Sequence, residues 1–358
     1  MDLYEMGWTE SDQQQFEEMN DPTLMPCRVS EEHRSGYRLL TTDGELSAEL
    51  SGRLRHQLVD GGDRPAVGDW VLARVRADEG SASITAVMPR RTALIRNRTD
   101  NTTRPQVIAA NLDTVFVMCS LNRDFNLRRI ERYLALVWDS GARPVVLLTK
   151  ADLCDDTATH VEQTSAIAWG VNVHPVSALT GDGIDALEPH LRVGQTVALV
   201  GSSGVGKSTL LNRLLGADAM ATGEARPDDD RGRHTTSHRS LSVLPGGAML
   251  VDTPGMREVG MWESAEGVRT TFEDVEAYAA DCRFKDCRHE DEPGCGVLRA
   301  VEDGVLEPSR HAGYLKLQRE LAHQERRVDE RARIEHDHAM RRIYTARKKS
   351  LKQLYKNR

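Results

Sequence analysis

The feature that most constrains this chain is a strand, a glycine-rich loop and a helix that follow one another without a break. Residues 196–200 (TVALV) have the apolar run of a buried strand, and a helical pattern covers 209–215. Between them, 201–208 (GSSGVGKS) fits the phosphate-loop pattern G-x-x-x-x-G-K-[ST], which this strand-to-helix context supports. The alternative is a plain Gly/Ser turn, which the strand, the lysine and the serine together disfavour.

Each part of this loop suits the binding of phosphate. Glycines let the backbone wrap the phosphates, and the following helix N-terminus adds positive potential. We expect Lys207 to reach the β- and γ-phosphates and Ser208 to ligate Mg²⁺. The residues predicted to bind nucleotide here are Gly201, Ser202, Ser203, Gly204, Val205, Gly206, Lys207, Ser208 and Thr209.

A second phosphate-side motif, 252–255 (DTPG), follows the apolar strand 248–251. We expect Asp252 to hold Mg²⁺ through a water and the N–H of Gly255 to contact the γ-phosphate. D-x-x-G alone is a common turn. At 45 residues beyond Lys207 and directly after a strand, it is typical of the entry to switch II.

The base-recognition motif [NT]-K-x-D occurs as 149–152 (TKAD), at the end of the apolar strand 144–149. Asp152 is expected to accept hydrogen bonds from guanine N1–H and N2–H₂, which adenine does not present in that pattern. The stem of Lys150 is expected to pack on the base. Thr149 stands where Asn is usual, and its hydroxyl can still tie loops together. A plain helix cap is the alternative interpretation of this motif.

Ser177 and Ala178 follow the strand 171–176 and resemble the accessory loop whose backbone contacts guanine O6. Each of the two guanine motifs is weak by itself. Because both lie at the ends of successive strands, together they favour GTP over ATP.

The order of these motifs is reversed relative to the usual GTPase order. The guanine loops precede the phosphate loops, which predicts a circularly permuted nucleotide domain. Switch II then leads directly into the C-terminal elements. We therefore hypothesise that movement dependent on the γ-phosphate passes directly to a Cys/His segment that follows.

The polar stretch 216–240 suits a mobile switch I. We favour Thr236 over Thr235 as the residue that completes the Mg²⁺ shell. Met256 replaces the glutamine that many GTPases use to orient water, so we expect slow intrinsic hydrolysis with activation from outside. His234 is a candidate for positioning the water, and a solvent-exposed loop histidine is an equally good interpretation. The predicted catalytic residues are Lys207, His234 and Thr236.

Three cysteines and one histidine lie close together within 282–295. Their spacing, C-x4-C-x-H-x5-C, supplies Cys282, Cys287, His289 and Cys295 as a soft donor set that suits one structural Zn²⁺. Free cysteines on a helical hairpin are the alternative.

The remaining patterns predict a multidomain α/β protein. Five short strand candidates between 24 and 90 suit a small barrel, for which an OB-fold is the best choice. Strands alternate with helices from Asp113, which predicts a doubly wound α/β sheet. The expected parts are a flexible N-terminal arm (1–23), an OB-fold (24–92), a permuted GTPase domain (105–276), a zinc-binding domain (277–325) and a basic tail (326–358).

The net charge of −8 conceals a basic C-terminus. The final 18 residues, from Arg341, hold eight basic residues and no acidic one. A local contact with a polyanion and a solvated charged helix are equally good interpretations of this tail. No apolar run approaches the ~20 residues that span a bilayer. No membrane partner is expected, and a cytoplasmic location is the default expectation.

Taken together, these residues resemble the bacterial ribosome small-subunit-dependent GTPase A family, the RsgA/YjeQ type. The match runs from about 24 to 325. Its carriers are 65–70 (PAVGDW), 149–152, 201–209, 232–236 (GRHTT), 252–255 and the Cys/His segment 282–295.

The resemblance implies an N-terminal OB-fold β-barrel, a circularly permuted P-loop GTPase domain and a C-terminal zinc-binding helical domain. It also implies a role in late maturation of the small (30S) ribosomal subunit, contact with 16S rRNA, GTP hydrolysis stimulated by that subunit, and release on hydrolysis to GDP. We expect a monomer. Two alternatives stay open: a GTPase with a non-ribosomal partner, and an RNA-binding chaperone that only senses GTP.

Overall fold

The computed structural model describes residues 1–33, 35–58, 64–97, 105–122, 124–216, 239–252 and 265–323, together with residue 326. The chain divides into two compact units. The first comprises residues 1–100 and 104–273, and the second comprises 274–358 with 101–103. Within the described ranges, no helix combines the length and the apolar composition that a bilayer crossing needs.

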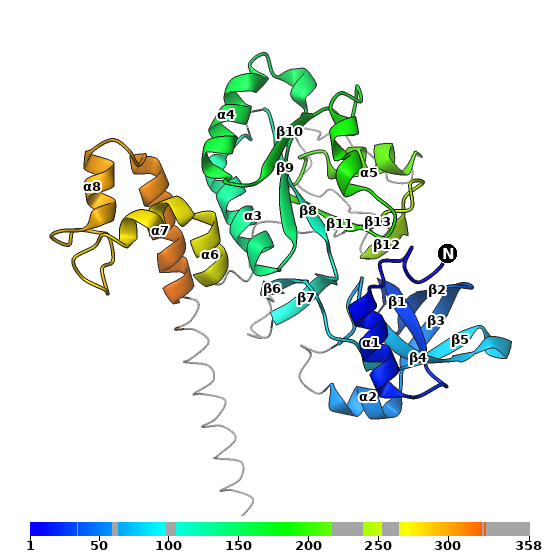
Figure 1. Cartoon of the computed structure of the whole chain (residues 1–358). Helices are drawn as coiled ribbons and strands as arrows, with labels where there is room; N and C mark the ends of the chain where they lie inside the picture. The colour runs from blue at the N-terminus through cyan, green and yellow to red at the C-terminus, as the bar shows by residue number, and fades with distance from the viewer. Residues whose placement is uncertain are drawn as a thin grey trace, which may run out of the picture. The chain divides into compact units, whose positions relative to one another are not determined.

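The N-terminal part of the first unit is a closed five-stranded barrel (Figure 1). Its spatial order is β1-β2-β3-β5-β4, and β4 pairs back onto β1. β3 and β5 run parallel, whereas the other neighbours are antiparallel. This topology confirms the predicted OB-fold. The strands are β1 (Met25–Glu32), β2 (Tyr37–Thr41), β3 (Gly44–Leu50), β4 (Trp70–Arg76) and β5 (Ser81–Val87), with the short helices α2 (Gly52–Gln57) and η1 (Ala77–Glu79).

The N-terminal segment is folded, in contrast to the flexible arm that we expected. Helix α1 (Glu10–Met19) starts at a reciprocal capping box between Thr9 and Asp12. Trp8 is buried and packs edge-to-face on Trp70 of the barrel, with ring centroids 4.7 Å apart. The sequence prediction missed this segment because its few apolar residues find their partners only in the folded barrel.

Arg28 of β1 joins the barrel to two other parts of the first unit. Its side chain is fully buried, and burial lowers its pKa to about 10. It donates to the carbonyl oxygens of Met6, Gly68 (3.3 Å) and Asn111 (3.2 Å), and to the Thr196 hydroxyl (2.8 Å). One guanidinium therefore ties the N-terminal segment, the barrel and the nucleotide domain together.

The nucleotide domain contains five parallel strands in the order β10-β9-β8-β11-β13. Strand β12 pairs antiparallel with β13, and it also meets β1 of the barrel where Ser240 lies opposite Glu31. A two-stranded ribbon precedes this sheet in the chain. The strands are β6 (Ala93–Asn97), β7 (Pro105–Ala110), β8 (Thr114–Ser120), β9 (Arg143–Thr149), β10 (Asn172–Val176), β11 (Thr196–Gly201), β12 (Ser240–Val243) and β13 (Met249–Asp252).

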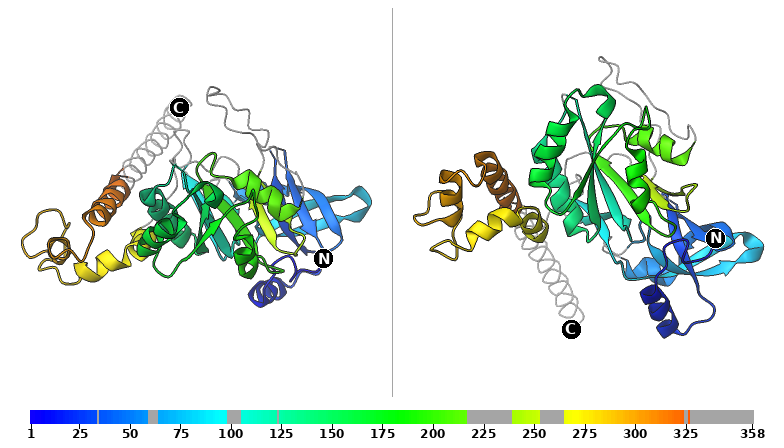
Figure 2. Two further views of the ribbon diagram at one scale, coloured as in Figure 1. Left: turned by 90° about the horizontal axis from the view of Figure 1, so that it is seen from above. Right: turned by 45° about the horizontal axis from the view of Figure 1, so that its top comes forward.

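The sheet has helices on both faces (Figure 2). Alternate residues of β8 belong to different cores: Val117 packs with Leu134 of α3, whereas Phe116 packs with Leu210 of α5. This alternation is what a buried parallel strand requires, and it confirms the predicted doubly wound sheet. The helices are α3 (Leu127–Asp139), η2 (Ala151–Leu153), α4 (Thr157–Ile167), η3 (Ile184–His190), α5 (Lys207–Leu215) and α6 (Ala265–Thr271).

The second unit is helical and small. It contains α7 (Glu273–Ala279), α8 (Gly296–Glu302) and a helical stretch over 308–323. Arg310 is buried and forms a bidentate ion pair with Asp274, and the hydroxyl of Tyr314 donates to Glu276 at 2.8 Å. Polar side chains therefore help to hold the helices together, beside buried apolar residues such as Val275, Val297 and Leu317.

The packing of Trp8 yields a stability prediction. Trp8→Ala should lower the free energy of unfolding of the first unit by about 3 kcal/mol, because it removes a buried aromatic side chain. Chemical denaturation followed by circular dichroism measures this change. Trp169→Ala is the matched control, since Trp169 is 62% exposed and its removal should change stability by less than about 0.5 kcal/mol. Equal effects of the two substitutions would contradict the packing described here.

Candidate functional site

The loop between β11 and α5 has the backbone that phosphate binding needs. A Cβ atom at Gly201 would lie 2.6 Å from the carbonyl oxygen of Met118, so only glycine fits there. Gly206 has a φ of +102° and precedes α5, and it offers no side chain to cap the helix N–H groups. The start of α5 is thus open to an anion.

Lys207 is held over this loop by main-chain carbonyl groups. Its Nζ donates to the oxygens of Gly201 (2.7 Å) and Ser202 (2.6 Å). Carbonyl groups carry no net charge, so these two bonds orient the ammonium group without neutralising it. The side chain is therefore placed before any phosphate arrives.

Asp252 ends β13, the strand next to β11. Burial raises the pKa of its carboxyl group above the usual value, and the positive charge of Lys207 opposes that rise. The parallel pairing of β13 with β11 brings the predicted entry to switch II next to the strand that carries the phosphate loop.

Thr149, at the end of β9, connects the guanine motif to the phosphate loop. Its buried hydroxyl donates to the Val205 carbonyl oxygen at 2.6 Å and lies 3.4 Å from that of Cys119. The Thr149 hydroxyl therefore links the guanine motif to the phosphate loop by a hydrogen bond. Lys150 follows with a φ of +58°, which turns the chain into η2 and leaves Asp152 exposed.

The accessory loop after β10 is also joined to the phosphate-loop helix. Ser177 is buried, its N–H donates to the Asp182 carbonyl at 2.9 Å, and its hydroxyl accepts from the Thr180 N–H at 3.2 Å. Arg213 of α5 donates to the carbonyl oxygens of Leu179 (3.4 Å) and Thr180 (3.5 Å). The turn that contains Ala178 is thus fixed from two sides.

These loops gather because β10, β9, β8, β11 and β13 are parallel neighbours (Figure 1). The carboxyl ends of parallel neighbours meet at one edge of the sheet, which is where doubly wound folds bind ligands. Three predicted site residues, His234, Thr236 and Gly255, lie outside the described residues, as do Thr235 and Met256.

Sequence reasoning missed three polar residues at this edge: Asp124, Arg129 and Arg213. Asp124 and Arg129 contact Ser202 of the phosphate loop, and Arg213 holds the accessory loop. A signal was present for Asp124, because it closely follows the apolar run of β8 at the same edge of the sheet.

The helix that follows the switch II region, α6, is held by α3 within the first unit. The N–H of Gly267 in α6 donates to the Asp139 carboxylate of α3 at 2.7 Å. A Cβ atom at Gly267 would lie 2.2 Å from the Ala135 carbonyl oxygen, so the helices approach closely. Any movement passed from switch II to the Cys/His segment must therefore act through a helix that α3 holds.

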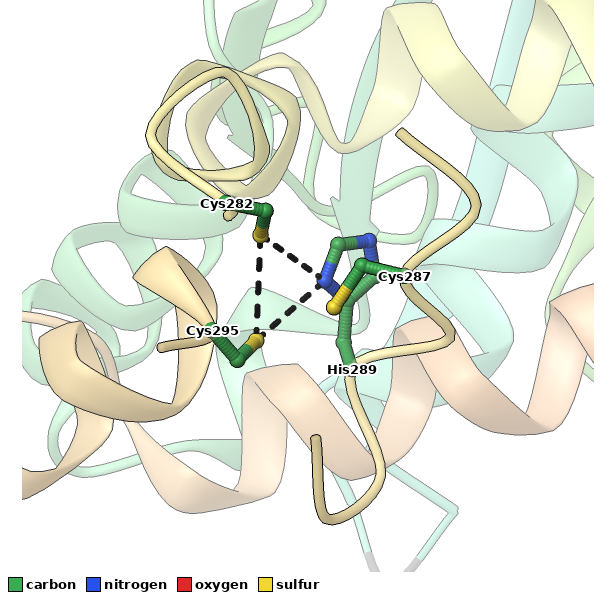
Figure 3. Close-up of side chains that lie close together, drawn as sticks. All are labelled: Cys282, Cys287, His289 and Cys295. Carbon is green, nitrogen blue, oxygen red and sulfur yellow. Dashed lines mark hydrogen bonds between the residues drawn. The ribbon is translucent and has the colours of Figure 1, made fainter. Parts of the chain in front are cut away.

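The second unit brings Cys282, Cys287, His289 and Cys295 together (Figure 3). One ligand atom from each lies within 4.8 Å of all the others. The Nδ1 atom of His289 is 3.5 Å from the Cys282 sulfur and 3.4 Å from the Cys295 sulfur, and those sulfurs are 3.8 Å apart. The four side chains point toward one centre and could hold a metal ion.

The chemistry of these donors fits a cation. Burial opposes ionisation of Cys282, yet the N–H groups of Gly296 and Val297 leave the pKa of its thiol lowered. Burial and the sulfurs of Cys295 and Cys282 raise the pKa of the Cys287 thiol to about 12. Cysteine binds metal as the thiolate, and a bound cation would compensate the negative charge of the thiolates gathered here.

The fold and the edge loops define a class of protein. A P-loop follows the fourth of the five parallel strands in spatial order, and its guanine motifs lie earlier in the chain. This arrangement is that of a circularly permuted GTPase, a GTP-hydrolysing enzyme. Comparison with known proteins narrows the class: the chain belongs to the RsgA GTPase family, whose family model matches residues 87–262.

Several relatives and solved structures support this membership. The "Small ribosomal subunit biogenesis GTPase RsgA" of Opitutus terrae is 47% identical over 92% of both chains. The "Small ribosomal subunit biogenesis GTPase RsgA 2" of Vibrio vulnificus is 42% identical over 99% of this chain and 98% of that one. The crystal structure of YjeQ from Thermotoga maritima has a TM-score of 0.64 at 27% identity, covering 84% of this chain and 99% of its own.

The bond from Thr149 to Val205 yields a binding prediction. Thr149→Val keeps the shape of the side chain and removes its hydroxyl, so GDP should bind about five- to tenfold more weakly as the phosphate loop loses its tie. Titration with a fluorescent GDP analogue measures this. Thr149→Ser, which keeps the hydroxyl, should bind within about twofold of the unaltered protein. Unchanged affinity in the valine variant would show that the tie is dispensable.

Proposed function

We propose that this chain is a GTP hydrolase that acts in late maturation of the small (30S) ribosomal subunit. On this proposal it binds 16S rRNA, its hydrolysis is stimulated by the subunit, and it leaves once GDP has formed. The observation that carries the proposal is similarity along almost the whole chain to proteins named for biogenesis of that subunit. It acts as a monomer in the cytoplasm, where ribosomal subunits are assembled.

The guanine base is recognised at the ends of β9 and β10. Asp152 accepts the base N–H groups, and the stem of Lys150 packs on the ring. The backbone of Ser177 and Ala178 contacts O6. Two hydrogen bonds support this assignment. Thr149 links the guanine motif to the phosphate loop, and Arg213 links the accessory loop to α5, the helix that follows the phosphate loop. A site whose parts are already joined binds its ligand with less ordering cost.

The phosphates lie in residues 201–209, with Lys207 on the β- and γ-phosphates and the Gly255 N–H on the γ-phosphate. Ser208 and Thr236 would hold the Mg²⁺ that enters with the nucleotide, and Asp252 would act on it through a water. When bound, this ion would neutralise charge on the β- and γ-phosphates. Lys207 supports this assignment, because two carbonyl groups aim its ammonium group across the loop.

Hydrolysis by the free protein is slow. Met256 cannot orient a water molecule, so His234 takes that role when the ribosomal partner binds. Activation therefore depends on the partner rather than on the nucleotide site alone.

The barrel offers one surface for rRNA. Arg38, Ser47, Ser81 and Arg76 lie in one register across β2, β3, β5 and β4. They line an open depression of about 650 Å³. Both arginines are more than 40% exposed, and each pairs with a neighbouring glutamate, so a phosphate group would compete for them. Serine hydroxyls and arginines suit contact with an RNA backbone. The basic residues of the tail, 326–358, are a second candidate for contact with rRNA.

Cys282, Cys287, His289 and Cys295 would hold one structural Zn²⁺. The donor set and its tight geometry support zinc over harder cations. Bound zinc would link the loops of 282–295 to one another.

The proposed function is tested by measuring GTP hydrolysis with and without purified small ribosomal subunits. Stimulation of at least about tenfold is expected, since partner-supplied groups accelerate GTPases by that much or more. Lys207→Ala should abolish turnover under both conditions. Turnover that subunits leave unchanged would favour a GTPase with a non-ribosomal partner. Binding of GTP without turnover would favour a GTP-sensing RNA chaperone.

The zinc site makes a separate prediction. Elemental analysis of the purified protein should find one zinc per chain, and Cys295→Ser should lose it, because three donors hold zinc more weakly than four. Limited proteolysis should then cut within 274–323. Cys154→Ser is the matched control and should keep the metal and the protection, since Cys154 lies outside the cluster. Full protection in the Cys295→Ser protein would contradict a stapling role.

A further inference from the structure

A charged cluster outside the recognised GTPase motifs touches the phosphate loop. The Ser202 hydroxyl donates to the Asp124 carboxylate at 2.8 Å. Arg129 of α3 lies 2.7 Å from the same carboxylate oxygen, 3.3 Å from the Asp124 carbonyl oxygen and 3.5 Å from the Ser202 hydroxyl. Asp124 comes from the loop after β8, so the cluster joins the centre of the sheet to the phosphate loop.

Ser202 carries this contact onward to Lys207. The hydroxyl of Ser202 bonds to Asp124, and its carbonyl oxygen accepts from the Lys207 ammonium at 2.6 Å. A residue held through its side chain cannot rotate its carbonyl freely. The position of the Lys207 ammonium therefore depends on the bond between Asp124 and Ser202.

The charge of Asp124 needs compensation in this place. Although burial opposes it, hydrogen bonds from Arg129 and Ser202 and the charges of Arg129 and Lys150 hold the pKa of this carboxyl group below its usual value. The group is thus a carboxylate next to a loop that binds phosphates. The Asp124 carboxylate and the phosphates of a bound nucleotide would repel each other unless a cation lies between or beside them. Arg129 supplies that cation by direct contact.

We propose that Asp124 is a positioning residue that fixes Lys207 through Ser202, and that Arg129 neutralises Asp124 so that the phosphates of the nucleotide are not repelled. The proposal rests on the proposed GTP site and concerns its regulation by residues that touch no nucleotide. Hydrogen bonding and charge are separate functions of the one carboxylate, and substitutions can separate them.

The test compares four variants by titration with a fluorescent GDP analogue. Asp124→Ala removes the acceptor for Ser202 and should weaken binding about tenfold, the effect of one charge-assisted hydrogen bond. Asp124→Asn keeps an oxygen acceptor and removes the charge, so its affinity should equal or exceed that of the unaltered protein. Arg129→Ala removes the cation in direct contact with the carboxylate and should weaken binding at least about tenfold.

The decisive variant is the double substitution Arg129→Ala/Asp124→Asn. It should bind GDP about tenfold more tightly than Arg129→Ala alone, because it removes the repelling charge and keeps the acceptor. If the cluster only supported folding, the loss of GDP affinity in the double variant would equal or exceed the sum of the losses in the two single variants. Higher salt should reduce the defect of Arg129→Ala, since screening weakens repulsion.

Controls separate this inference from the proposed function. Asp185→Ala removes an exposed aspartate of the same domain and should leave affinity unchanged. Thermal unfolding without nucleotide identifies any variant that fails to fold. If the unaltered protein does not bind GDP, the proposed function fails. If it binds GDP, the inference is overturned when Asp124→Ala matches Asp124→Asn, or when the double variant binds no more tightly than Arg129→Ala.

Discussion

Parallel pairing of β8 with β9 on one side and β11 on the other is the constraint on which the nucleotide site depends. These three strands end at the same edge of the sheet, and each delivers one part of the site there: Asp124 after β8, Thr149 at the end of β9, and the phosphate loop after β11. Because hydrogen bonding between strands does not depend on the order in which the chain supplies them, the permuted motifs still converge. Side-chain hydrogen bonds between the loops then fix their positions relative to one another at this edge.

Much of this arrangement follows from local sequence. Apolar runs predicted β9, β11 and β13, since a strand covered on both faces must be apolar throughout. The phosphate loop and the Cys/His segment carry their chemistry at fixed spacing, so both could be recognised without a structure. Cys282 and Cys295 meet because short loops leave them little freedom to do otherwise.

Contacts between distant segments could not be predicted in the same way. The packing of Trp8 on Trp70 and the burial of Arg28 depend on surfaces that form only when the barrel has closed. Asp124 and Arg213 belong to no recognised pattern, because a polar residue acquires its role from whichever loop the sheet places beside it. The roles of His234, Thr236 and Gly255 remain predictions from the sequence.

The pairing of β12 with β1 has a consequence for how the first unit can move. Without the barrel, β12 would be an edge strand, with a row of free N–H and C=O groups on its outer side. β1 covers part of this edge where Glu31 meets Ser240, and the ion pair between Arg239 and Glu32 (3.4 Å) lies beside it. Separation of barrel and sheet would expose polar backbone and remove two acceptors, Asn111 and Thr196, from the buried Arg28 guanidinium. The barrel and the nucleotide sheet therefore resist hinge opening and should respond to nucleotide as one body.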